Sequence, residues 1–191
     1  MEPSKRFSDV IAHLPATGPL PLGDLLAAVG SRAHGAALLI LALPEAIPLP
    51  LPSASAVLGV PLVAISAHLC LFGEAARLPR RLGAIVLPSW ILRILHDRVA
   101  PILAWAEGVS HARLEAIASR ERLLGLACLY LSMLLLLPLP FFNVPPALCL
   151  VLLAWGMLQR DGACALLGLL GTVAVPALLA GLVDWARGVL G

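Results

Sequence analysis

The chain has 191 residues, 60% of them hydrophobic and only 13% charged, with a net charge of +2. Its mean hydropathy is +0.97, and because soluble domains carry about 25% charged residues, the composition predicts an integral membrane protein. We expect a single all-α domain over residues 1–191. The nearly neutral charge argues against nucleic acid as a partner.

The N-terminal part predicts a short helix ahead of the first apolar segment. Residues 1–20 contain no long apolar run, so no cleavable signal peptide is expected. Residues 22–34 (LGDLLAAVGSRAH) have the pattern of an amphipathic helix with Asp24 as N-cap. This helix opens a first repeat over about residues 22–74.

The apolar stretch 36–72 predicts a helical hairpin. It runs for about 37 residues, whereas one spanning helix needs roughly 20. We therefore expect a helix to about Ile47, a turn, and a returning helix that ends at Phe72 and is capped by Ser53 or Ser55. The prolines of the turn are Pro44, Pro48, Pro50 and Pro52.

A connector over about residues 75–107 separates the two halves. Arginines alternate there with apolar segments, and Trp90 and Trp105 lie near them in the sequence. Aromatic rings beside cations are typical of helices in the headgroup zone of a bilayer. The alternative is a tilted spanning helix over 82–106, which would invert the topology of all that follows.

The second half repeats this plan over about residues 108–162. The apolar stretch 123–159 predicts a hairpin, and a last apolar run over about 163–187 predicts a C-terminal transmembrane helix. The prolines of the second turn are Pro138, Pro140, Pro145 and Pro146.

Offsets between the halves predict an internal duplication. Arg32 precedes Arg120 by 88 residues, and Pro48 precedes Pro138 by 90. If both stretches are hairpins, 12 of the 13 Lys and Arg lie on one side of the membrane. That side, with the N-terminus, is expected to be cytoplasmic.

The proline turns carry the candidate binding residues. Glu45 is an acidic group inside an apolar run, and an ionisable group at membrane depth is a functional candidate. Ser53, Ser55 and Asn143 could bind a polar ligand at helix N-termini in a shared cavity, as in broken-helix transporters. The alternative is that the turns lie at the far surface, where Glu45 is solvated and Asn143 only caps a helix.

A charged segment at the opposite, cytoplasmic end predicts a gate or a cap. Arg160 and Asp161 join the second hairpin to the last helix, and Arg32 precedes the first hairpin. Their functional interpretation is a gate or an ion pair. The simpler interpretation is that Arg160 ends one helix and Asp161 begins the next.

No enzyme is expected. The sequence lacks HExxH, GxSxG, P-loop and GxGxxG motifs, and its four cysteines lack metal-ligand spacing. We therefore predict no catalytic residues, no metal and no cofactor.

The second half resembles the ExoD family of bacterial exopolysaccharide-synthesis proteins. The shared pattern is a leucine run, the turn PLPFFN, then PPAL, and an ending in Arg160-Asp161-Gly162. The first half is similar, with LPEAIPLP followed by LGVPL. The resemblance implies a multi-pass inner-membrane protein linked to exopolysaccharide production.

Two functions follow as expectations. The first is binding or transport of a small ion or lipid-linked solute through a cavity formed by two re-entrant, proline-broken hairpins. The alternative is a non-transporting accessory or regulatory factor that docks on a polysaccharide synthase through the basic region 74–122. A homodimer is expected because glycines on short helices favour close helix packing.

Overall fold

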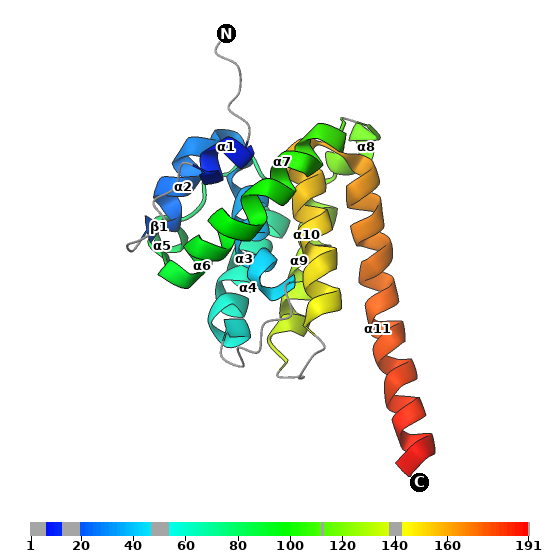
Figure 1. The fold of residues 1–191 in the computed structure, drawn as a ribbon. Coiled ribbons are helices and arrows are strands. Elements are labelled where there is room, and N and C mark those ends of the chain that lie inside the picture. The colour runs from blue at the N-terminus through cyan, green and yellow to red at the C-terminus, as the bar shows by residue number, and fades with distance from the viewer. Residues whose placement is uncertain (1–6, 13–19, 47–53, 112, 138–142, 191) are drawn as a thin grey trace.

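The computed structural model describes residues 7–12, 20–46, 54–111, 113–137 and 143–190. The fold is helical nearly throughout, which confirms the all-α prediction (Figure 1). In chain order the elements are α1 (Phe7–Ala12), β1 (Leu20–Pro21), α2 (Leu22–Val29), a 3-10 turn (Gly30–Arg32), α3 (Ala33–Ala46), α4 (Ala54–Phe72), α5 (Arg80–Gly83), β2 (Val86–Leu87), α6 (Ser89–Ile94), a π-helical turn (Leu95–Val99), α7 (Ala100–Val109), α8 (Glu115–Ala118), α9 (Glu121–Leu135), α10 (Val144–Gln159) and α11 (Gly162–Leu190).

Each long apolar stretch contains two packed helices, α3 with α4 and α9 with α10. The four helices have 14, 19, 15 and 16 residues. Among the described residues, none of the helices is both long and apolar enough to cross a membrane, so the predicted C-terminal transmembrane helix is not supported. Several predicted turn residues lie outside the described residues: Pro48, Pro50, Ser53, Pro138 and Pro140.

The two hairpins pack crosswise into one bundle. The returning helix α4 packs mainly on α9, and α10 packs mainly on α3 and α11. The core between them is apolar, with Leu38, Leu62, Leu131 and Leu150 fully buried. Removing such side chains from water is the main favourable term in folding.

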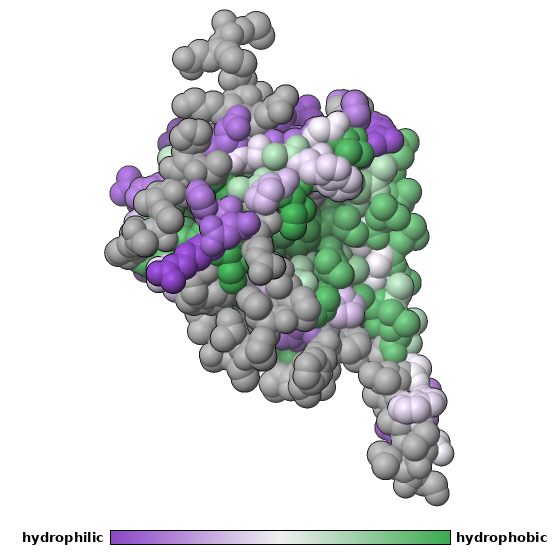
Figure 2. Space-filling view, viewed as in Figure 1, coloured by the Kyte–Doolittle hydropathy of each residue, from purple (hydrophilic) through white to green (hydrophobic). Residues whose placement is uncertain are grey.

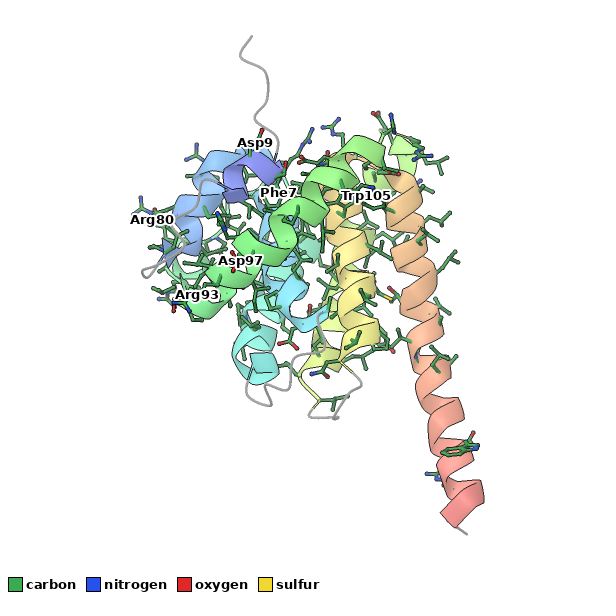
Figure 3. The ribbon with its side chains drawn as sticks, viewed as in Figure 1. Phe7, Asp9, Arg80, Arg93, Asp97 and Trp105 are labelled. Atoms are coloured by element: carbon green, nitrogen blue, oxygen red, sulfur yellow. The ribbon has the colours of Figure 1, made fainter. Side chains whose placement is uncertain are left out.

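The connector forms an amphipathic helical segment from α6 through α7, which crosses the bundle obliquely (Figure 1). Ile91, Leu95 and Leu103 face inward and are buried, while Trp105 is 71% exposed. The inner face packs on α1. Figure 3 shows Phe7 of α1 close to α7 and Trp105 farther along that helix.

A carboxylate on α7 holds the start of α1. Glu107 Oε1 accepts the backbone N–H of Phe7 at 2.8 Å, and Oε2 accepts the Ser8 hydroxyl at 2.5 Å. The Gln159 amide at the end of α10 also donates to Glu107, at 3.3 Å. Because the first N–H groups of a helix lack partners within it, Glu107 serves as a cap from another element and ties α1, α7 and α10 together.

Helix α2 begins at Leu22, as expected, but it ends at Val29 and its N-cap differs from the prediction. Asp24 is not the N-cap; α2 begins after Pro21, and Asp24 lies exposed in its first turn. The reason is a contact that is distant in sequence: β1 pairs with β2, and Leu22 donates its N–H to Ile85 at 2.8 Å. This short antiparallel pairing was not predicted.

Candidate functional site

A charged cavity of about 520 Å³ lies at one end of the bundle. At this end α3 and α9 begin, α4 and α10 end, and α8 forms a further wall. The lining residues are Arg32, Glu74, Ala75, Glu115, Ala116, Ala118, Ser119, Glu121, Met157 and Arg160. We call this space the bundle-end cavity.

Two arginines provide its positive charge. Arg32 lies in the 3-10 turn before α3 and donates from Nη1 to the carbonyl of Leu158 at 2.7 Å. Arg160 directly follows α10 in the left-handed conformation, with φ of 54°. Within the described part of the chain, neither guanidinium forms an ion pair with a carboxylate. Both arginines therefore retain donors for a bound anion.

Three glutamates line the same cavity, and two of them, Glu74 and Glu121, are joined by a hydrogen bond. Glu74 Oε1 accepts the N–H of Gly35 at 3.1 Å, and the N–H of Glu74 donates to Glu121 Oε2 at 2.8 Å. Burial raises the pKa of Glu74, and the neighbouring Glu121 adds to this, while the Gly35 N–H and the more distant Arg32 and Arg160 oppose it. Glu74 therefore holds a proton to higher pH than an ordinary glutamate does.

Asp161 lies beside the cavity but does not line it, and it holds together two segments next to the cavity. It is only 1% exposed, and its Oδ1 accepts the N–H of Ala163 at 3.0 Å while its Oδ2 accepts the Ser110 hydroxyl at 3.0 Å. Burial alone would raise the pKa of Asp161, but these hydrogen bonds, one from the Cys164 N–H and the nearby Arg113 hold it below its usual range. Asp161 therefore joins the start of α11 to the segment that leads into α8.

The structure separates the predicted site residues into two groups. Arg32 and Arg160, which are 128 positions apart in the sequence, line the same cavity, and Asp161 lies beside it. Glu45 and Asn143 lie at the opposite end of the bundle, at the end of α3 and the start of α10. Glu45 is 7% exposed, and the side chain of Asn143 makes no capping hydrogen bond to α10.

The remaining predicted residues near the turns belong to helices. Pro44 lies buried inside α3, and Pro146 lies buried at the start of α10. Ser55 belongs to the first turn of α4. None of the three lines the bundle-end cavity.

The sequence analysis missed Glu74, Glu121, Glu115 and Ser119 as site residues. The sequence analysis gave Glu74 no role beyond its place at the end of the first repeat. A usable signal was present, because Glu74 lies two residues after the end of one apolar stretch and Glu121 lies two residues before the start of the other. Charges that flank two antiparallel hairpins at their open ends meet when the hairpins pack side by side.

A histidine pair packs between α3 and α4, outside the cavity. His34 Nε2 lies 2.9 Å from His68 Nδ1, and the two rings are stacked with centroids 5.1 Å apart. His34 is fully buried. The pair thus bonds the two helices of the first hairpin to each other.

The sequence model of a family described as "Exopolysaccharide synthesis, ExoD" matches residues 6–181. The chain belongs to the ExoD family. The ExoD match includes both hairpins and all residues of the bundle-end cavity. Membership implies involvement in exopolysaccharide synthesis.

A more distant relative adds no activity to this assignment. The chain is 23% identical over 161 residues to a protein of Synechocystis sp. described as uncharacterized, covering 83% of this chain and 76% of the relative. No solved structure matches the chain significantly.

Proposed function

We propose that this ExoD protein supports exopolysaccharide synthesis at the bacterial inner membrane by binding the phosphodiester headgroup of a lipid-linked intermediate in the bundle-end cavity. The observation that carries the proposal is the pair Arg32 and Arg160, two guanidinium groups on one cavity without a carboxylate partner among the described residues. Arginine binds phosphate oxygens through planar, charge-assisted hydrogen bonds. Transport of an ion has less support, because Glu45, the residue expected to bind it, lies at the other end of the bundle.

The outer surface suits the lipid tail of such a ligand. Large apolar side chains cover the outside of α9 and α11, and Figure 2 shows apolar surface over α11. Exposed apolar surface on this scale indicates contact with a membrane or a partner. The exposed side chains are Leu123, Leu126, Met133 and Leu137 around α9, and Leu167, Leu170, Val173 and Leu178 on α11.

This arrangement places a headgroup site next to a tail-binding surface. Leu123, which is 50% exposed, is two residues from Glu121 in the cavity lining. A lipid with its phosphate on the arginines could extend its chain along α9. The proposal needs no helix to cross the bilayer, because the hairpins can enter it and return.

The proposal includes the predicted internal duplication. Helix α3 begins 88 residues before α9, and α4 begins 90 residues before α10, which are the offsets of the repeated sequence motifs. The crosswise packing of α4 on α9 and of α10 on α3 is what a pseudo-twofold axis would produce. Both observations support two copies of one hairpin whose open ends meet at the cavity.

Replacing Arg32 and Arg160 by alanine should weaken phosphodiester binding. Charge-assisted hydrogen bonds contribute about 1.5–3 kcal/mol each, so we expect each single variant to raise the Kd at least about tenfold. The measurement is calorimetric titration of the purified chain in neutral detergent with dihexanoylphosphatidylglycerol, a short-chain phosphodiester lipid. The matched control is Arg187→Ala, whose guanidinium is 79% exposed on α11. Unchanged affinity in both cavity variants would overturn the proposal.

A second function is favoured by a basic surface outside the cavity lining. Arg80 and Arg93 are exposed on α5 and α6, and Figure 3 places them on the side of the molecule away from α11. This surface fits an acidic face of a polysaccharide synthase. If docking is the function, the double variant Arg80→Ala/Arg93→Ala loses exopolysaccharide output in a complemented deletion strain while the cavity variants retain it. The opposite pattern supports headgroup binding.

A further inference from the structure

We propose that the bundle-end cavity takes up one proton on Glu74 when it binds a phosphodiester anion, so that anion and proton bind as a pair. The inference rests on the proposed function, since it concerns the same cavity and the same ligand. It adds a coupling between two bound species, which makes the occupancy of the site depend on pH.

Glu74 lies where several charged groups converge. Its carboxyl group follows the end of α4 and reaches the start of α3, where Gly35 donates to Oε1. Charged and titratable groups approach it from each neighbouring element. They are Arg32 from the 3-10 turn, Arg160 from the end of α10, Glu121 and Cys128 from α9, and Glu115 on the α8 wall of the cavity.

In the empty cavity the two arginines favour the ionised form of Glu74. They do so from a distance, because neither forms an ion pair with it. Burial and the charge of Glu121 act in the opposite direction. The ionised form of Glu74 is therefore favoured first by the Gly35 N–H and further by the two guanidinium groups that would bind the ligand.

An anion bound to Arg32 and Arg160 changes this balance. It neutralises the field of the arginines and brings a further negative charge into the cavity that Glu74 and Glu121 already share. A like charge within about 4–6 Å disfavours an ionised carboxylate. Glu74 then takes the proton on Oε2, since Oε1 accepts the Gly35 N–H. By linkage, a protonated Glu74 strengthens anion binding by the same factor.

The test measures the affinity for dihexanoylphosphatidylglycerol between pH 5 and pH 8. A phosphodiester has no titratable group in this range, so any proton uptake belongs to the protein. We expect the Kd of the wild-type chain to fall as the pH falls, by at most about tenfold per pH unit for one coupled proton. Calorimetry at a single pH in two buffers of different ionisation enthalpy should show a net uptake of up to one proton per ligand.

Two carboxylate variants make the test specific. Glu74→Gln mimics the protonated form, and it should bind with the low-pH affinity at every pH and without proton uptake. Asp184→Asn alters an exposed carboxylate on α11, outside the cavity lining, and it should keep the pH slope. A slope that persists in Glu74→Gln, or wild-type binding without proton uptake, would overturn the coupling while leaving headgroup binding intact. Absence of binding at every pH would overturn both.

Discussion

Replacing Gly125 by valine is expected to lower the free energy of unfolding by about 3 kcal/mol, with Gly125→Ala costing about 2 kcal/mol. A Cβ at this position would lie 2.7 Å from the backbone N of Cys70 and 2.9 Å from its Cα. These are backbone atoms of α4, so no side chain can rotate away. Helices α4 and α9 would have to separate, although their contact joins the two hairpins.

The measurement for Gly125 is equilibrium denaturation in neutral detergent, followed by circular dichroism. Gly181→Ala in α11 is the matched control, because a Cβ at this position would have no atom within 4 Å. Alanine is favoured over glycine in a helix interior by roughly 0.5–1 kcal/mol, so the control should be neutral or slightly stabilising. A Gly125→Ala variant as stable as the wild-type chain would contradict the close packing of α4 on α9.

Replacing Asp161 by alanine should also be strongly destabilising, by about 2–3 kcal/mol. The change removes the acceptor for the Ser110 hydroxyl and for the first N–H groups of α11, and it leaves these partly buried donors without this partner. Asp184→Ala is the control, since that carboxylate is 78% exposed on α11. It should change the stability by less than about 0.5 kcal/mol.

The stabilisation of the folded chain by Asp161 should decrease as the pH falls. Because the pKa of Asp161 is lowered in the folded chain, its stabilisation is present above the pKa of the unfolded chain and is lost as the pH falls through the folded value. The stability difference between the wild-type chain and Asp161→Asn should therefore shrink on acidification from pH 7 towards pH 3. A difference that stays constant over this range would show that the carboxylate charge is not involved.

Much of the helical layout could be predicted because it depends on local patterns. The hairpin helices α3, α4, α9 and α10 follow apolar runs interrupted by prolines, and α4 ends at Phe72, as expected. Helix caps were harder to predict, because α2 begins at the expected Leu22 without a cap from Asp24, at a point where β1 pairs with β2. Its N-terminus therefore depends on a segment about 65 positions away.

The candidate site could likewise be predicted only in part, because some of its features depend on local sequence and others on tertiary packing. Charge patterning identified Arg32, Arg160 and Asp161, since they flank the predicted hairpins. It did not distinguish the roles that packing assigns to them, with the two arginines in the cavity lining and Asp161 buried as the cap of α11. Glu74 and Glu121 acquire their importance only when the ends of α4 and α9 meet.

The sequence by itself determined that this chain is helical, apolar and built around two proline-interrupted segments, and it carried the motifs of the ExoD family. These properties follow from composition and local periodicity. Only the tertiary structure decided which ends of the hairpins meet, and therefore that Arg32, Glu74, Glu121 and Arg160 share one cavity. The physical reason is that a charged site assembled from four helix ends depends on how the helices cross, and glycines such as Gly125 set that crossing through close backbone contact.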